Sequence, residues 1–140
     1  MAYHLGAKSK AALVGVHPTL VAIVERAIGL TPVDFRVTEG LRTFERQQEL
    51  FRAGKSKTMK SRHLLGYAVD LFPLGLADPW NRNNPETKAA WRAVAEAMYQ
   101  AGRERGVAIT WGGDFNGDGP DVGTDGWDWP HFELPRTVYR

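Results

Sequence analysis

The chain contains no cysteine, which excludes disulfides, thiolate metal sites and cysteine nucleophiles. A metal site in this protein must therefore use His, Asp or Glu side chains. Long apolar runs are also lacking, because the longest, near residues 19–24, is far shorter than the roughly 20 residues that cross a bilayer. Residues 1–6 show no basic segment followed by an apolar one, so the sequence predicts no signal peptide. We expect synthesis in the cytosol, with release by another factor if the protein acts outside.

The length of 140 residues predicts a single domain, and a hydrophobic content of 43% is ordinary for a globular core. The net charge of +2 is unevenly divided, since residues 1–62 carry 11 Lys and Arg against 5 Asp and Glu. Five basic residues lie in residues 52–62, and six acidic residues lie in residues 112–135. The basic strip is either a surface for an anionic polymer, such as nucleic acid or bacterial cell wall, or a solvated loop.

Apolar spacing and turn residues predict an alternation of helices and short strands. Helices are expected over residues 9–14, 18–28, 44–53 and 85–105, and strands over residues 35–38, 67–72, 107–111 and 131–134. The order shows no strand–helix–strand rhythm. We therefore predict an α+β fold with a small, mostly antiparallel sheet packed by helices.

Two histidines and one aspartate have the composition of a catalytic zinc site. His63, Asp70 and His131 supply two imidazoles and one carboxylate, which leaves a fourth coordination position open to water. Asp70 lies on a predicted strand, and His63 lies seven residues upstream in the loop that enters it. His131 comes from a distant part of the chain, as closure of a tetrahedral site requires. The set predicts a zinc hydrolase.

Residues around His131 suggest the rest of the chemistry. Asp128, three residues earlier, is placed to act as the general base that moves a proton from water to the leaving amine. Glu133 shares the strand face of His131 and can accept the other N–H of its ring. Trp127 and Trp129 flank Asp128 and would wall the cleft or stack on substrate.

These residues resemble the signature of the zinc DD/LD-peptidases, peptidase family M15. The resemblance rests on two motifs, Ser61-x-His63-x-x-Gly66-x-Ala68-x-Asp70 and Asp128-x-x-His131-Phe132-Glu133. The segments 37–43, 54–58 and 111–114 are similar to segments of the L-alanyl-D-glutamate endopeptidase branch, so the likeness spans nearly the whole chain. It implies a Hedgehog/DD-peptidase-like fold.

The resemblance also implies roles for individual side chains. It implies that His63, Asp70 and His131 bind zinc, that Asp128 is the catalytic base, and that Arg42 steadies the oxyanion. The alternative for Arg42 is a surface salt bridge. Ser61 either contacts substrate or holds the loop of His63.

The substrate follows from the resemblance alone. It would be the stem peptide of peptidoglycan, cut between L-Ala and D-Glu by a phage or prophage endolysin that leaves the host cytoplasm through a holin pore. The lack of a separate wall-binding domain favours a Gram-negative host. We expect a monomer with no nucleic-acid partner and no stable membrane insertion. The alternatives are a D-Ala-D-Ala carboxypeptidase or dipeptidase of the same fold, or a zinc-stabilised wall-binding module without activity.

A second metal site is suggested by an acidic, glycine-bearing segment. The oxygen-bearing residues at positions 1, 3, 5 and 12 of an EF-hand-type calcium loop would be Asp114, Asn116, Asp118 and Asp125. Position 12 is usually Glu, whose longer side chain reaches the ion with both oxygens. The segment is therefore either a calcium site or a cluster of turn-forming residues.

Overall fold

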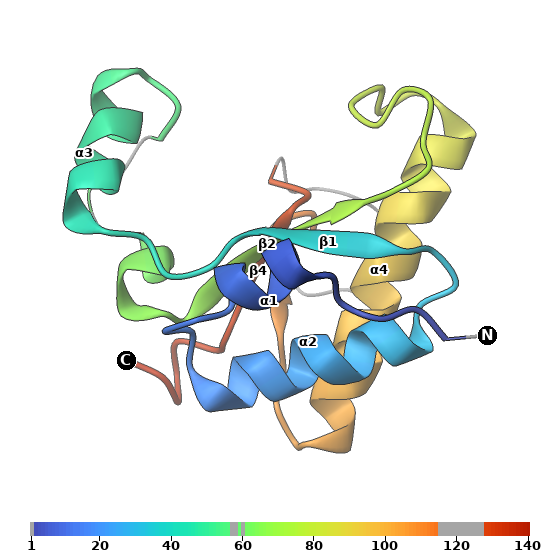
Figure 1. The fold of residues 1–140 in the computed structure, drawn as a ribbon, viewed down its shortest axis with the longest axis horizontal. Helices are drawn as coiled ribbons and strands as arrows, with labels where there is room; N and C mark the ends of the chain where they lie inside the picture. Colours follow the sequence, from blue (N-terminus) through green and yellow to red (C-terminus); the bar gives the residue numbers. More distant parts are fainter. Residues whose placement is uncertain (1, 57–58, 60, 115–127) are drawn as a thin grey trace.

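The protein is described by a computed structural model that covers residues 2–56, 59, 61–114 and 128–140 (Figure 1). The elements in chain order are α1 (Ala7–Ala12), α2 (Pro18–Leu30), β1 (Phe35–Glu39), α3 (Phe44–Arg52), the 3₁₀ helix η1 (Arg62–Leu65), β2 (Ala68–Pro73), α4 (Pro85–Glu104), β3 (Thr110–Trp111) and β4 (His131–Glu133). The predicted α+β architecture is confirmed. Among the described residues, no helix combines the length and the apolar character needed to span a membrane.

The four strands form one antiparallel sheet in the order β1-β2-β4-β3. The late strand β4 thus lies between β2 and β3. The pairing of β2 with β4 sets Asp70 opposite His131 and Ala68 opposite Glu133. Residues that are far apart in the sequence therefore become neighbours through the sheet register.

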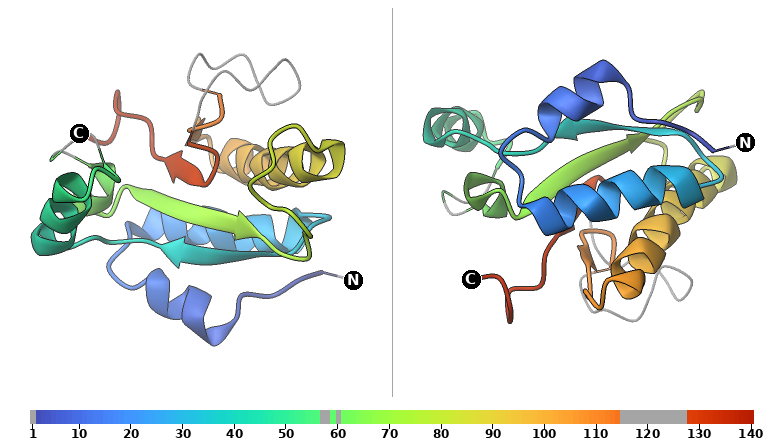
Figure 2. Two further views of the ribbon diagram at one scale, coloured as in Figure 1. Left: turned by 90° about the horizontal axis from the view of Figure 1, so that it is seen from above. Right: turned by 60° about the horizontal axis from the view of Figure 1, so that its bottom comes forward.

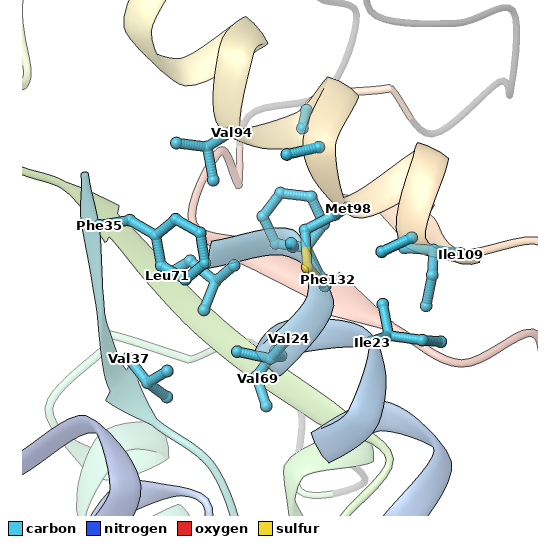
Figure 3. Close-up of a cluster of buried hydrophobic side chains, with 14 of the residues drawn as sticks. Ile23, Val24, Phe35, Val37, Val69, Leu71, Val94, Met98, Ile109 and Phe132 are labelled. Atoms are coloured by element: carbon cyan, nitrogen blue, oxygen red, sulfur yellow. The ribbon is translucent and has the colours of Figure 1, made fainter. Parts of the chain in front are cut away.

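The core lies where α2 and α4 pack on each other and on the sheet (Figure 2). Side chains from both helices meet those of the strands in one cluster (Figure 3), which includes Ile23, Val24, Val69, Leu71, Val94, Met98 and Phe132. Side chains alternate across a strand, so Val69 and Leu71 enter this core while Asp70 points away from it. The strand that supplies Asp70 is thus anchored from its other face.

Three helices differ from the predictions made from apolar spacing, and the first of them, α1, spans Ala7–Ala12 where residues 9–14 were expected. The helix α2 continues past Gly29 to Leu30 and ends before Pro32, because the residue before a proline disfavours the helical conformation. Apolar spacing places Phe44, Gln47 and Phe51 on one side of α3, but the only buried side chain of this helix is Gln47, while Phe44 and Phe51 are 55% and 46% exposed. In Figure 1, α3 stands apart at the opposite side of the molecule from α4.

The strand predicted over residues 107–111 is shorter than expected. Only Thr110 and Trp111 pair with β4. The backbone N–H of Val107 instead donates to Gly102 at 2.9 Å, which closes the end of α4. Because β4 spans only His131–Glu133, it offers few residues with which β3 can pair.

Candidate metal centre

The structure brings the side chains of His63, Asp70 and His131 together. One ligand atom from each residue lies within 4.8 Å of the others. Asp70 Oδ1 is 3.2 Å from His63 Nε2 and 3.6 Å from His131 Nδ1. The two imidazole rings lie edge to face, with centroids 5.2 Å apart. Three donors from η1, β2 and β4 thus converge on one point.

The short helix η1 fixes His63. The Ser61 side chain caps this helix by accepting from the His63 backbone N–H at 3.2 Å, so Ser61 holds the His63 loop. Gly66 ends the helix with a left-handed φ of 74°. The ring atom Nδ1 of His63 lies 2.8 Å from the carbonyl oxygen of Gly40, which can only accept. Nδ1 therefore donates to this carbonyl, and Nε2 is the nitrogen that faces Asp70 and could bind a metal.

His131 is oriented through its Nε2 atom, whereas His63 is oriented through Nδ1. Its Nε2 lies 3.0 Å from Oε1 of Glu133, at the position that the period-two spacing predicts. A hydrogen bond from Nε2 to this carboxylate leaves Nδ1 directed at Asp70 as the candidate metal ligand. The two histidines would thus use different nitrogens, and each is oriented by a separate acceptor.

Hydrogen bonds among Asp70, the two histidines and Glu133 shift the pKa values of Asp70 and His131. Burial favours the neutral form of Asp70, but hydrogen bonds with His131 and His63 outweigh it and hold the pKa of this carboxyl well below its usual range. Burial would lower the pKa of His131, but hydrogen bonds with Asp70 and Glu133 raise it to about 9. The raised pKa favours a positive charge on His131 beside Asp70, where a metal cation would lie. Two imidazoles and a carboxylate with this charge balance fit a divalent metal.

Asp128 lies at the edge of the same centre, directly before the turn that leads into β4. Its carbonyl accepts from the His131 N–H at 3.1 Å, and its own N–H donates to Gly112 at 3.2 Å. A side chain at Gly112 would overlap the Asp128 carbonyl, so only glycine permits this approach. Burial raises the pKa of Asp128, the nearby Asp70 carboxylate raises it too, and the charge of His131 opposes the shift.

The Arg42 side chain is largely buried, and hydrogen bonds to neighbouring side chains fix its guanidinium group. Its Nε and Nη2 donate to the two carboxylate oxygens of Glu39, both at 2.7 Å, and Nη1 donates to Gln47 Oε1 at 2.7 Å. A further contact at 3.4 Å reaches Ser61 Oγ. Arg42 thus forms a salt bridge, as one of the two interpretations from the sequence expected, but its side chain is only 8% exposed and does not lie on the surface. The guanidinium is instead held rigidly between β1 and α3.

Glu39 and Gln47 were not identified as site residues from the sequence. The signal for Gln47 was a polar residue on the same helical side as Phe44 and Phe51. Glu39 lies three residues before Arg42, a spacing that does not distinguish a partner from a solvated acid.

Two other predicted site residues are buried, and the rest lie outside the described residues. Trp129 is 3% exposed and packs against Trp91 and Trp111, so its ring belongs to the core, and the Arg82 guanidinium lies over it at 4.6 Å from the centroid. Asp114 is buried and accepts from the Tyr99 hydroxyl at 3.1 Å. Trp127, Asn116, Asp118 and Asp125 lie outside the described residues.

Comparisons with known proteins agree with one another. The family model described as phage L-alanyl-D-glutamate peptidase matches residues 1–135. The L-alanyl-D-glutamate peptidase of Escherichia phage T5 is 33% identical over 142 residues, covering 96% of this chain and 99% of that protein. The crystal structure of the Serratia marcescens L-Ala D-Glu endopeptidase ChiX matches with a TM-score of 0.75 and 36% identity, covering 95% of this chain and 90% of that one. The chain therefore belongs to the phage L-alanyl-D-glutamate peptidase family.

Proposed function

We propose that the protein is a peptidoglycan-degrading endolysin that hydrolyses the L-alanyl-D-glutamate bond of the stem peptide with one zinc ion. The observation that carries this proposal is the convergence of His63, Asp70 and His131, within 4.8 Å, in a chain of this peptidase family. The donor set fits zinc because it offers nitrogen and oxygen ligands and leaves a position free. When bound, zinc supplies a Lewis acid that polarises the scissile carbonyl and lowers the pKa of water.

Asp128 is the proposed general base. It takes a proton from the attacking water and delivers it to the amine of D-Glu as the peptide bond breaks. Its raised pKa supports this role, because a base works best when its pKa lies closer to the working pH than that of an ordinary carboxylate. Its position directly before β4 keeps it beside the ligand His131.

Arg42 is the proposed donor to the oxyanion that develops on the scissile carbonyl. Its bidentate pairing with Glu39 fixes the plane of the guanidinium before substrate binds, so little reorganisation is needed during the reaction. Ser61 and Gln47 hold Nη1 from the other side. The remaining N–H of Nη2 is the donor that we assign to the substrate.

The decisive experiment is mass spectrometry of peptidoglycan digested by the zinc-loaded protein. A new N-terminal D-Glu is expected. Release of terminal D-Ala would instead show the D-Ala-D-Ala carboxypeptidase or dipeptidase specificity. Wall binding by the zinc-loaded protein without any peptide product would show a non-catalytic module. We further propose that the protein acts as a monomer and reaches the wall from the host cytoplasm through a holin-type pore.

The calcium site is a second, separate proposal. It is supported by the sequence pattern from Asp114 to Asp125 and by burial of the Asp114 carboxylate. Bound calcium would link Asp114 to residues shortly before Asp128 and so adjust the position of the base. Millimolar calcium should then raise both the melting temperature and the lytic rate of the zinc-loaded protein. If calcium changes neither the melting temperature nor the lytic rate, the calcium proposal is wrong.

A further inference from the structure

Arg62, which precedes the ligand His63 in η1, is buried although the sequence places it in a basic strip. The residue is only 7% exposed. Its Nη2 donates to the carbonyl oxygen of Leu134 at 2.9 Å, directly after β4. Its guanidinium also lies over the ring of Tyr67, at 4.8 Å from the centroid. The strip interpretation is therefore wrong for this residue, whose charge points into the protein.

The buried partner of Arg62 is Glu133, the carboxylate that orients His131. Arg62 Nε lies 3.2 Å from Glu133 Oε2, at ion-pair distance but without the alignment of a hydrogen bond. The other oxygen, Oε1, lies 3.0 Å from His131 Nε2. Glu133 is itself 5% exposed. Arg62 and His131 thus contact opposite oxygens of one buried carboxylate.

A second arginine contacts the same carboxylate from the surface. Arg136 donates to Glu133 from Nε to Oε2 at 3.0 Å and from Nη2 to Oε1 at 3.5 Å, which are hydrogen bonds that Arg62 does not make, but the Arg136 side chain is 70% exposed. Water screens such a pair and the long side chain is free to move, so Arg136 constrains Glu133 little. Arg62 differs because packing on Tyr67 and the bond to Leu134 fix its position.

We propose that Arg62 is a positioning residue of the metal centre, which sets the orientation of His131 through Glu133. One short helix would then hold both histidine ligands, His63 directly and His131 through the Arg62–Glu133 pair. The inference rests on the proposed metal site and extends it beyond the three ligands. Partners that orient a metal ligand typically change metal affinity by about 10- to 100-fold when they are lost.

The test compares zinc affinities by competition with a chromophoric chelator. Arg62→Gln should bind zinc about 10- to 100-fold more weakly than the wild type. Arg136→Gln removes the exposed arginine from the same carboxylate and serves as the matched control, with an expected change of about twofold or less. Equal affinities of Arg62→Gln and the wild type would overturn the proposal. A wild type that binds no zinc would instead overturn the proposed function.

A double-mutant cycle separates positioning from general stability. In a Glu133→Gln background, Arg62→Gln should weaken zinc binding by no more than about twofold, because the carboxylate through which Arg62 acts is already gone. The same loss in both backgrounds would show a merely structural role and overturn the proposal. If Arg62→Gln does not fold, Arg62→Lys decides. Lysine keeps the charge but cannot reach Glu133 and Leu134 together, so a severalfold loss supports the proposal and an unchanged affinity overturns it.

Discussion

Asp70 and His131 are partners across β2 and β4, and the carboxylate of Asp70 lies 3.6 Å from Nδ1 of His131. The sheet register itself therefore sets the geometry of two of the three proposed ligands. The third, His63, is set by η1, which leads into β2. A metal bound here would join three elements of the fold, so its removal should lower the stability of the protein as well as its activity.

Zinc should stabilise the protein by mass action. At a free zinc concentration 100 times the Kd, the free energy of unfolding should rise by about 2.7 kcal/mol. Calorimetry with and without a chelator measures this as a shift in Tm. His63→Ala should fold but show no zinc-dependent shift. A shift of the same size in that variant would place the metal elsewhere.

Metal binding should also depend on pH. The pKa of His131 in the metal-free protein is raised from 6.5 to about 9, so zinc must displace a proton at neutral pH. Zinc affinity should therefore increase with pH up to about 9. Titration calorimetry at pH 7 in buffers of different ionisation enthalpy should detect about one proton released for each ion bound. Buffer-independent heats would contradict this protonation state.

The same shift predicts how stability changes when no metal is bound. A raised pKa in the folded state stabilises the metal-free protein fully below pH 6.5, and this contribution is lost as pH rises through about 9. Chemical denaturation at pH 6 and pH 9 measures the loss. In the zinc-loaded protein Nδ1 of His131 carries no proton, so stability should not decline between pH 6 and pH 9 for this reason.

Asp128→Asn should abolish most of the activity without disturbing the metal. The amide cannot take a proton from water, and loss of a general base typically costs about 10² to 10⁴ in rate. We expect zinc affinity and Tm to stay close to those of the wild type. Lysis assays with purified peptidoglycan give the rate. Undiminished lysis by this variant would assign the base to another residue.

Arg42→Lys should lower kcat for a stem-peptide substrate by about 100-fold, because lysine cannot reproduce the bidentate contact with Glu39 that aims the donor. Zinc affinity should change little, since the Arg42 side chain contacts none of the three ligands. Arg46→Lys, an exposed position on α3, is the control and should leave kcat unchanged. If both variants keep wild-type kcat, Arg42 is not the oxyanion donor.

Gly66→Ala should destabilise the protein more than Gly54→Ala. Both glycines have a φ of 74°, so both substitutions carry the strain of a left-handed backbone, about 1–2 kcal/mol. A Cβ at Gly66 would also lie 2.7 Å from the carbonyl oxygen of Gly15, whereas the space at Gly54 is open. The difference in unfolding free energy between the variants measures the added clash. Zinc affinity should fall only in Gly66→Ala, because η1 carries His63.

Much of the metal centre could be predicted from local spacing. The alternation of a strand relates His131 to Glu133, and a loop before a strand relates His63 to Asp70. These relations span a few residues and depend on periods that the backbone imposes. The burial of Arg62 could not be predicted in this way, because its partners Glu133 and Leu134 come from a distant part of the chain. The ion-pair partner of Arg42 lies only three residues away, but the contacts with Gln47 and Ser61 do not follow from such a spacing. A run of basic residues looks the same in a sequence whether its members face water or a buried carboxylate.

Helix α3 gives a second example of burial that the sequence pattern did not predict. Phe44, Gln47 and Phe51 share a helical side, and the pattern predicts burial of the aromatic rings. The structure buries the amide instead, because Gln47 holds Arg42 while α3 stands away from the core. Periodicity identified the side of the helix that faces the protein but not which of its residues are needed there.

The placement of β4 between β2 and β3 has a consequence for biosynthesis. Ribosomes make the chain from its N-terminus, so His63, Asp70 and Arg62 emerge long before the strand that completes their site. A nascent chain that ends before residue 131 has neither the second imidazole nor the carboxylate that orients it. The order of translation thus delays assembly of the centre, and unfinished chains have no complete set of the proposed zinc ligands.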